Sequence, residues 1–205
     1  LLPSYLERPG SSLVYMAREL MNQSGHPLNG FFLHNLQELR QRILRLEADG
    51  QKTLLLGVSF ALLDLAALGP LRLKHTLVME TGGMKGRRKE MVREELHEKL
   101  KQGLGVEQVH SEYGMTELLS QAYSTGNGIF HTPPWMRVVI RDRYDPFHYP
   151  VKGQTGGINV IDLANLYSCS FLETQDLGRM IPGGGFEVIG RFDGSEMRGC
   201  NLLAK

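Results

Sequence analysis

The first 124 residues alternate between helical and strand-like hydrophobic patterns. Apolar residues at positions 36, 39, 43 and 46 share one face of a predicted helix that begins at Asn35 and ends near Ala48. Further helices are predicted over 11–22, 61–68, 85–102 and 118–123, and strands over 30–34, 53–60, 75–80 and 106–110. This alternation predicts βαβ units and a mainly parallel sheet.

The pattern changes after Ser124, because strand-like segments follow one another without a helix of convincing length between them. They are predicted over 136–141, 158–163, 170–174 and 187–192, with a hairpin turn at Gly183-Gly184-Gly185. We therefore predict an α/β fold: a mainly parallel sheet with helices over 1–124, followed by a mixed or antiparallel β subdomain over 125–205 that ends at a hinge region.

Composition narrows the class of protein. Hydrophobic residues make up 41% and charged residues 22% of the chain, as in soluble globular proteins, and the formal net charge is +1. That charge gives no reason to expect a nucleic-acid partner, and no apolar run approaches the roughly 20 residues of a membrane span. Two cysteines are too few for a disulfide framework or a zinc site. Nothing in the sequence argues for secretion, so a cytoplasmic location is the default expectation.

The first candidate site is the polar stretch Ser111–Glu117, between a predicted strand and a predicted helix. Gly114 allows a tight backbone path, and the free N–H groups of a new helix favour an anion. Thr116 can donate to a phosphate, Glu117 can hold Mg²⁺, and Tyr113 could stack on a base. The alternative is that Thr116 and Glu117 simply begin a helix.

The other candidate ligand-binding residues are each supported by a less specific sequence signal. Gly82 and Gly83 follow a predicted strand and would let the backbone approach a ligand closely. Asp176 could accept hydrogen bonds from a ribose diol, or could bond its own backbone in a turn. Arg191 could reach a ribose or a phosphate, with a surface salt bridge as the alternative.

The order of these motifs resembles the adenylate-forming (acyl-activating) superfamily. Tyr-Gly-Met-Thr-Glu at 113–117 matches the central motif of that superfamily without a gap. The stretches Leu1–Arg8, Ser111–Glu117 and Arg198–Leu202 are similar to the acyl-protein synthetase (LuxE) family, and the resemblance covers nearly all of the chain. That family supplies acyl groups to the fatty-acid reductase of bacterial luminescence, and it has many relatives outside luminescence.

The resemblance implies ATP-dependent activation of a carboxylic acid, such as a fatty acid, as acyl-AMP, followed by transfer to a protein thiol. An acyl-CoA ligase or a non-catalytic nucleotide- or partner-binding module are the alternatives. The implied roles are adenine packing for Tyr113, α-phosphate contact for Thr116, Mg²⁺ binding for Glu117, ribose binding for Asp176, ribose or phosphate contact for Arg191, and a border of the adenine and acyl pocket for Gly82 and Gly83.

The chain departs from that superfamily in ways that predict an incomplete catalyst. The upstream phosphate loop and the C-terminal subdomain with its catalytic lysine are missing, and the usual Thr-Gly-Asp is Thr174-Gln175-Asp176. We therefore expect a piece of a longer protein that binds nucleotide weakly and associates with itself through an exposed sheet edge and apolar surface.

Cys200 is the predicted acyl acceptor, because the resemblance places an acylated cysteine near the C-terminus. Arg198 is a nearby cation that could lower the pKa of the Cys200 thiol, and Gly199 would leave its sulfur open. The alternative is a buried small hydrophobic side chain. Cys169 fits a small core or surface residue better.

Overall fold

The computed structural model describes residues 1–2, 10–82 and 91–192 of the 205-residue chain. Its contacts divide the chain into two units, Leu1–His110 (unit 1) and Ser111–Lys205 (unit 2). These units reflect contacts alone, so a domain boundary after residue 124 stays a prediction. In the part of the chain that the structure describes, no helix is long and apolar enough to cross a membrane.

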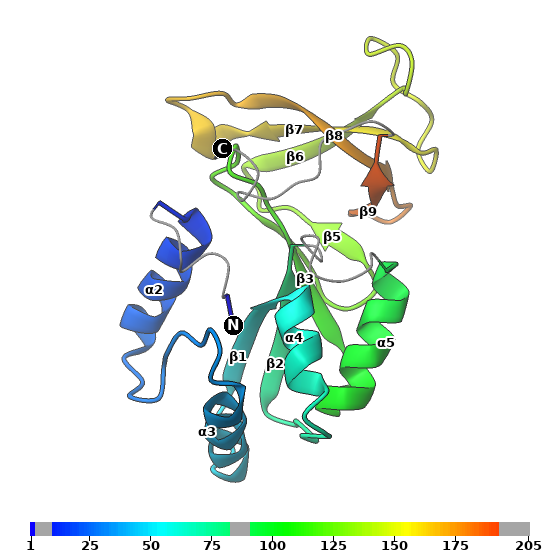
Figure 1. Cartoon of the computed structure of the whole chain (residues 1–205). Helices are drawn as coiled ribbons and strands as arrows, with labels where there is room; N and C mark the ends of the chain where they lie inside the picture. Colours follow the sequence, from blue (N-terminus) through cyan, green and yellow to red (C-terminus); the bar gives the residue numbers. More distant parts are fainter. Residues whose placement is uncertain (3–9, 83–90, 193–205) are drawn as a thin grey trace, which may run out of the picture. The chain divides into compact units, whose positions relative to one another are not determined.

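Unit 1 alternates helices and strands. In chain order its described elements are α2 (Ser12–Ser24), α3 (Leu36–Ala48), β1 (Thr53–Val58), α4 (Ser59–Ala66), β2 (Thr76–Thr81) and α5 (Arg93–Leu104). Strands β1 and β2 pair in parallel, with Thr53 opposite Thr76. The parallel pairing confirms the α/β character that the alternating pattern predicts (Figure 1).

Helices α4 and α5 pack side by side and form the centre of the unit 1 core (Figure 1). Leu62 and Leu65 on α4, and Leu100 and Leu104 on α5, are all fully buried. Gly103 lets the two helices approach closely, because a Cβ there would lie only 2.6 Å from the Cβ of Ala66. The core therefore depends on apolar helix faces that meet at short range.

Unit 2 is an antiparallel sheet. Its described elements are β3 (Val109–Tyr113, which begins in unit 1), β4 (Ala122–Ser124), β5 (Ile129–His131), β6 (Met136–Arg141), β7 (Gly156–Asp162), the 3₁₀ helix η1 (Leu163–Asn165), β8 (Phe171–Met180) and β9 (Phe186–Arg191). The strands follow the order β3-β4-β5-β9-β8-β7-β6. The glycines at 183–185 join β8 to β9 with positive φ angles, which confirms the predicted hairpin turn.

The core of unit 2 contains a group of aromatic rings. Phe130 and Phe186 are almost fully buried, with their ring centroids 5.6 Å apart. Tyr113 meets both rings edge-on, at 5.9 and 5.6 Å. Ile158 and Val160 on β7 extend this core through alternate inward positions.

The structure corrects two predictions in unit 1. Residues 30–34 form no strand. Instead Phe32 is buried beneath α3, where the Arg42 guanidinium lies 4.9 Å from its ring centroid and donates to the carbonyl of Leu28. Packing on a helix therefore replaces strand pairing in this segment.

The helix predicted over 85–102 begins later, at Arg93. Val92, at the N-cap position, has extended backbone angles (φ −67°, ψ 152°), and Glu94 and Glu95 occupy the first turn. Acidic side chains stabilise the positive N-terminal end of a helix, which explains a start at this point. Residues 85–90 lie outside the described part of the chain.

Candidate active site

The central motif does not lead into a helix, which corrects the prediction of a helix over 118–123. Tyr113 ends β3, and β4 returns antiparallel to it with Ala122 opposite Tyr113. A hydrogen bond of 3.1 Å from the N–H of Leu118 to the carbonyl of Met115 closes a turn between these strands. Thr116 and Glu117 occupy the middle of that turn, and both are exposed.

The backbone N–H groups after this turn bind a carboxylate of the protein itself. Asp162, at the end of β7, is completely buried. Its Oδ2 accepts from the N–H groups of Leu119 at 3.0 Å and Ser120 at 2.9 Å. Its Oδ1 accepts from the Ser120 hydroxyl at 2.7 Å and from the Ala164 N–H at 3.1 Å.

These hydrogen bonds lower the pKa of the Asp162 carboxyl group. Burial alone would raise the pKa of its carboxyl group, because burial disfavours the charged form. The hydrogen bonds from Ser120, Ala164 and Leu119 outweigh burial and hold the pKa below its ordinary value. Asp162 is therefore a carboxylate at neutral pH, and sequence reasoning missed it as a site residue.

Asn165 provides a second contact to the same turn. It lies in η1 and is almost completely buried. Its Nδ2 donates to the carbonyl of Glu117 at 2.7 Å, and its Oδ1 accepts from the Ser168 hydroxyl at 3.0 Å. The backbone of Glu117 is thus held while its side chain faces solvent.

Three of the predicted nucleotide-binding residues meet in unit 2. The hydroxyl of Tyr113 donates to Oδ2 of Asp176 at 2.8 Å. The Nε atom of Arg191 lies 3.5 Å from Oδ1 of the same carboxylate. Asp176 is 3% exposed and Tyr113 is 7% exposed, so this polar contact is formed largely inside the protein. The roles of these residues toward adenine and ribose stay predictions.

Asp176 lies within a strand, which corrects the turn that was one interpretation of this stretch. Strand β8 runs without a break from Phe171 to Met180, with a register shift against β9 between Leu177 and Gly178. The hydroxyl of Thr174 donates to the carbonyl of Ile158 at 2.8 Å, and the N–H of Asp176 donates to the Thr174 hydroxyl oxygen at 3.1 Å. The inward positions of β8 therefore carry the polar side chains.

Arg141 is a buried cation that the sequence does not reveal. It ends β6 and is 5% exposed. Its Nη1 donates to the carbonyl of Ile158 at 3.1 Å, and its Nη2 donates to the carbonyl of Thr174 at 2.8 Å. Nη2 also lies 3.0 Å from Oε1 of Glu173. The guanidinium thus links β6, β7 and β8 next to Asp176.

Gly82 lies in unit 1, immediately after β2. Its φ of 68° falls in the left-handed region that favours glycine. The Oγ atom of Ser59 lies 2.6 Å from the Gly82 carbonyl and 3.2 Å from Oε2 of Glu80, a buried carboxylate. Gly83 and Cys200 lie outside the described residues. Cys169 is exposed, and its thiol donates to the carbonyl of Phe171 at 3.1 Å.

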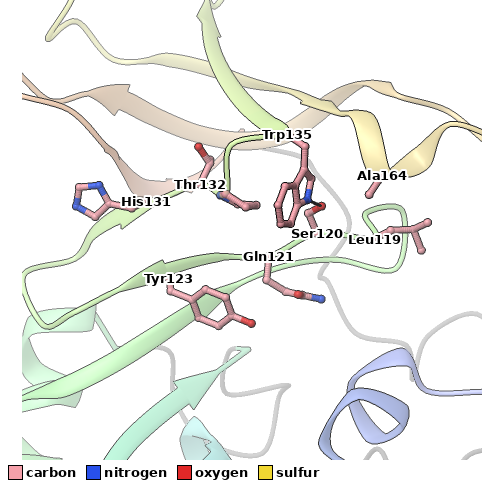
Figure 2. A pocket seen from close by; sticks show the side chains of 9 residues that line it. Leu119, Ser120, Gln121, Tyr123, His131, Thr132, Trp135 and Ala164 are labelled. Carbon is pink, nitrogen blue, oxygen red and sulfur yellow. Dashed lines mark hydrogen bonds between the residues drawn. The ribbon is translucent and has the colours of Figure 1, made fainter. Parts of the chain in front are cut away.

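An open hollow of about 540 Å³ adjoins the strand after the motif turn. Figure 2 shows the Trp135 ring beside Ser120, with its Nε1 donating to the Ser120 hydroxyl at 2.9 Å. Trp135 remains 53% exposed although its polar atom is bound. The ring orientation therefore depends on Ser120, and through Ser120 on Asp162.

The exposed carboxylate of Glu117 is compatible with a magnesium ion. Mg²⁺ usually takes one or two carboxylates together with substrate phosphates and several waters. Within residues 1–2, 10–82 and 91–192, no group of three or more His, Cys, Asp or Glu side chains could hold a metal ion. Glu117 would supply one carboxylate to such a site, with nucleotide phosphates and water as the other ligands.

No family model and no curated protein sequence matches the chain. Solved structures do match. ATP-bound MatB from Rhodopseudomonas palustris is 20% identical, with a TM-score of 0.53 over 74% of this chain and 33% of that one. O-succinylbenzoate coenzyme A synthetase (MenE) from Bacillus subtilis is 20% identical, with a TM-score of 0.53 over 78% of this chain and 36% of that one.

The fold is the adenylate-forming one. A luciferase-like enzyme from the mealworm Zophobas morio also shares it, at 20% identity and a TM-score of 0.51 over 74% of this chain and 41% of that one. The chain spans about a third of the length of MatB (33%). At these identities the likeness concerns the fold alone, and it covers only part of each protein.

Proposed function

We propose that this chain is part of an ATP-dependent ligase that activates a carboxylic acid as acyl-AMP, releases pyrophosphate, and transfers the acyl group to a protein thiol. A fatty acid is the proposed acid, as in the acyl-protein synthetase family that the motifs resemble. The proposed partner is an acyl-accepting or reductase protein, and the proposed location is the cytoplasm.

The observation that carries the proposal is the contact between Tyr113, Asp176 and Arg191. These residues come from three separate motifs that the adenylate-forming superfamily carries in the same order. Their side chains meet at 2.8 and 3.5 Å in a chain that has the adenylate-forming fold. A chance match of short motifs would give no reason for the matched residues to touch.

The proposed chemistry needs the charge of ATP to be balanced and its sugar to be oriented. Asp176 is held by Tyr113 and lies beside Arg191, so its carboxylate is oriented before a ribose hydroxyl would bind. Thr116, exposed in the motif turn, would donate to the α-phosphate, and Glu117 would hold Mg²⁺. The bound metal would neutralise charge that develops on the transferring adenylyl group and on the departing pyrophosphate.

An acyl-CoA ligase is the second candidate, because one neighbour in fold is named a coenzyme A synthetase. It would share the adenylation step and differ only in the thiol acceptor. A nucleotide- or partner-binding module that has kept the fold is the candidate from a different class. It would bind its ligand without exchanging pyrophosphate.

Pyrophosphate exchange separates the enzymes from the module. The intact protein that contains this chain should incorporate labelled pyrophosphate into ATP only when Mg²⁺ and a suitable carboxylic acid are present. Glu117→Gln should reduce the rate strongly, whereas Glu107→Gln, an exposed glutamate nearby in the sequence, should leave it unchanged. Absence of exchange across short, long and aromatic acids, in a protein that binds ATP, would favour the module.

The acyl acceptor requires its own experiment. With ATP, Mg²⁺ and a labelled fatty acid, an acyl-protein synthetase should form a hydroxylamine-labile label on itself or its partner, whereas a CoA ligase should label added coenzyme A. We propose Cys200 as the acceptor, so Cys200→Ser should abolish the protein label. Cys169→Ser is the matched control, and retention of the label by Cys200→Ser would exclude Cys200.

A further inference from the structure

Asp162 and Asn165 both hold the backbone of the motif turn from the same short segment. Asp162 binds the N–H groups of Leu119 and Ser120, and Asn165 binds the carbonyl of Glu117. The partners are separated by 42 to 48 positions in the sequence. The end of β7 and η1 therefore clamp the turn on both sides of Leu118.

The carboxylate of Asp162 has no remaining capacity for a ligand. A carboxylate offers about four acceptor sites on its two oxygens. The hydrogen bonds from Leu119, Ser120 and Ala164 occupy two sites on each oxygen. Asp162 is also completely buried, so it acts on other residues of the protein rather than on a substrate.

We propose that Asp162 and Asn165 are positioning residues that set the affinity for Mg²⁺·ATP by fixing the turn of Thr116 and Glu117. The inference rests on the proposed function, because it assumes that this turn contacts the nucleotide. Without the hydrogen bonds to Leu119, Ser120 and Glu117, the backbone of the turn would sample more conformations, and nucleotide binding would have to order it. The hydrogen bonds from Asp162 and Asn165, called the clamp below, order the turn before the nucleotide binds, so binding does not have to supply that free energy.

Substitution by the closest amide or acid should release the turn without creating a large cavity. Asp162→Asn replaces one acceptor oxygen by an NH₂ group that faces N–H or hydroxyl donors. Asn165→Asp replaces the donor to Glu117 by an oxygen that repels its carbonyl, and it keeps the acceptor for Ser168. Asp142→Asn is the matched control, because the Asp142 carboxylate likewise accepts backbone N–H groups, from Tyr144 and Asp145, in the loop that follows β6.

The only tryptophan of the chain gives an independent readout. Trp135 binds the Ser120 hydroxyl, which binds Asp162. The emission of Trp135 should therefore change in Asp162→Asn and stay unchanged in Asp142→Asn. In the unmodified protein, addition of Mg²⁺·ATP should also change the emission, because the nucleotide would contact a turn that is tied to the same carboxylate.

The deciding experiment is pyrophosphate exchange by the intact protein at varied Mg²⁺·ATP concentration. Asp162→Asn and Asn165→Asp should each raise the KM for Mg²⁺·ATP about 10-fold or more, with kcat changed less than about 3-fold. A role in folding alone would lower the active fraction, and hence the apparent kcat, at an unchanged KM. An unchanged KM in both variants, or an equal rise in Asp142→Asn, overturns the positioning role. If the unmodified protein does not exchange pyrophosphate, the proposed function fails, and this inference fails with it.

Discussion

The two units of the chain differ in what fills their interiors. Unit 1 buries an extended set of apolar side chains, many of them leucines, and encloses a smaller polar set: Ser59, Thr76, Glu80, Thr81 and His97. Unit 2 buries a substantial polar set beside its aromatic core: Ser111, Ser120, Ser124, Arg141, Asp162, Asn165, Thr174 and Asp176. Of the candidate nucleotide-binding residues, Tyr113 and Asp176 belong to this second interior, whereas Thr116 is exposed on the motif turn of the same unit.

The difference follows from where each kind of element finds hydrogen-bond partners for its backbone N–H and C=O groups. A helix pairs most of its N–H and C=O groups internally, so an apolar face is sufficient for packing. Turns and short strands leave backbone groups that need other partners. In unit 2, buried side chains supply them, as Asp162 does for Leu119 and Ser120 and as Arg141 does for Ile158 and Thr174.

The largest expected effect is on the apolar core of unit 1. Leu100→Ala removes a fully buried side chain from α5 and should lower the free energy of unfolding by about 2–5 kcal/mol. Leu44→Ala, on the outer face of α3 where the side chain is 41% exposed, should cost clearly less. Chemical denaturation followed by circular dichroism measures both, and equal losses would contradict the assigned core.

Substitution in the polar interior of unit 2 should lower the free energy of unfolding by a smaller amount. Arg141→Met keeps much of the side-chain volume but removes the guanidinium that donates to the carbonyls of Ile158 and Thr174, which should cost about 2–4 kcal/mol. Arg179→Met breaks an ion pair with Glu187 in which the arginine is 45% exposed, and should cost less than about 1 kcal/mol. Equal denaturation midpoints for the two variants would remove the special role of Arg141.

The contact between Tyr113 and Asp176 should contribute less again. Tyr113→Phe deletes one hydroxyl and keeps the ring against Phe130 and Phe186, so the expected cost is about 0.5–1.5 kcal/mol. Tyr15→Phe, at an exposed position of α2, is the matched control and should be neutral. If both variants unfold like the unmodified protein, the hydrogen bond carries no net stability.

The smallest expected effect is a loss of stability as the pH becomes acid, and both units should respond in the same direction. In unit 2, burial raises the pKa of Asp162, but hydrogen bonds outweigh burial and lower it below its ordinary value. In unit 1 the pKa of Glu47 is lowered in the same way, by hydrogen bonds from Thr76, Lys74 and His75 that outweigh burial. A lowered pKa in the folded state adds stability above the unfolded values of about 3.9 and 4.3. That stability is lost as the pH falls through the folded pKa. Asp162→Asn and Glu47→Gln should therefore destabilise at pH 7 and differ less from the unmodified protein near pH 3.

The sequence predicts unit 1 better than the connections of unit 2. Helix α3 has its apolar residues at clear helical spacing, and the structure begins and ends it within one residue of the prediction. The prediction of a helix over 118–123 was wrong because burial alternates along this segment with a period of two, whereas the apolar and polar residue types do not alternate in the same way. Ser120 and Ser124 face inward, and the apolar Leu119 and Tyr123 are exposed. The residue types of this strand-containing segment therefore do not show the alternation that would predict a strand.

The candidate site was predictable where a residue type is unusual for its position. Asp162 continues the inward alternation of Ile158 and Val160, and a carboxylate at an inward strand position indicates a buried hydrogen-bonded group. Arg141 offers no such signal, because it falls on the outward phase of the alternation in β6. Its burial depends on strands β7 and β8, which come later in the chain, so only the tertiary structure reveals it.

The clamp on the motif turn also sets an order of events during synthesis of the chain. Ribosomes extend a protein from its N-terminus, so the segment of Thr116 and Glu117 emerges while Asp162 and Asn165 are still to be made. The N–H groups of Leu119 and Ser120 therefore bind water until β7 follows, 42 residues later for Ser120. A nascent chain that stops before Asp162 contains the whole central motif but lacks the structure that gives the motif its shape.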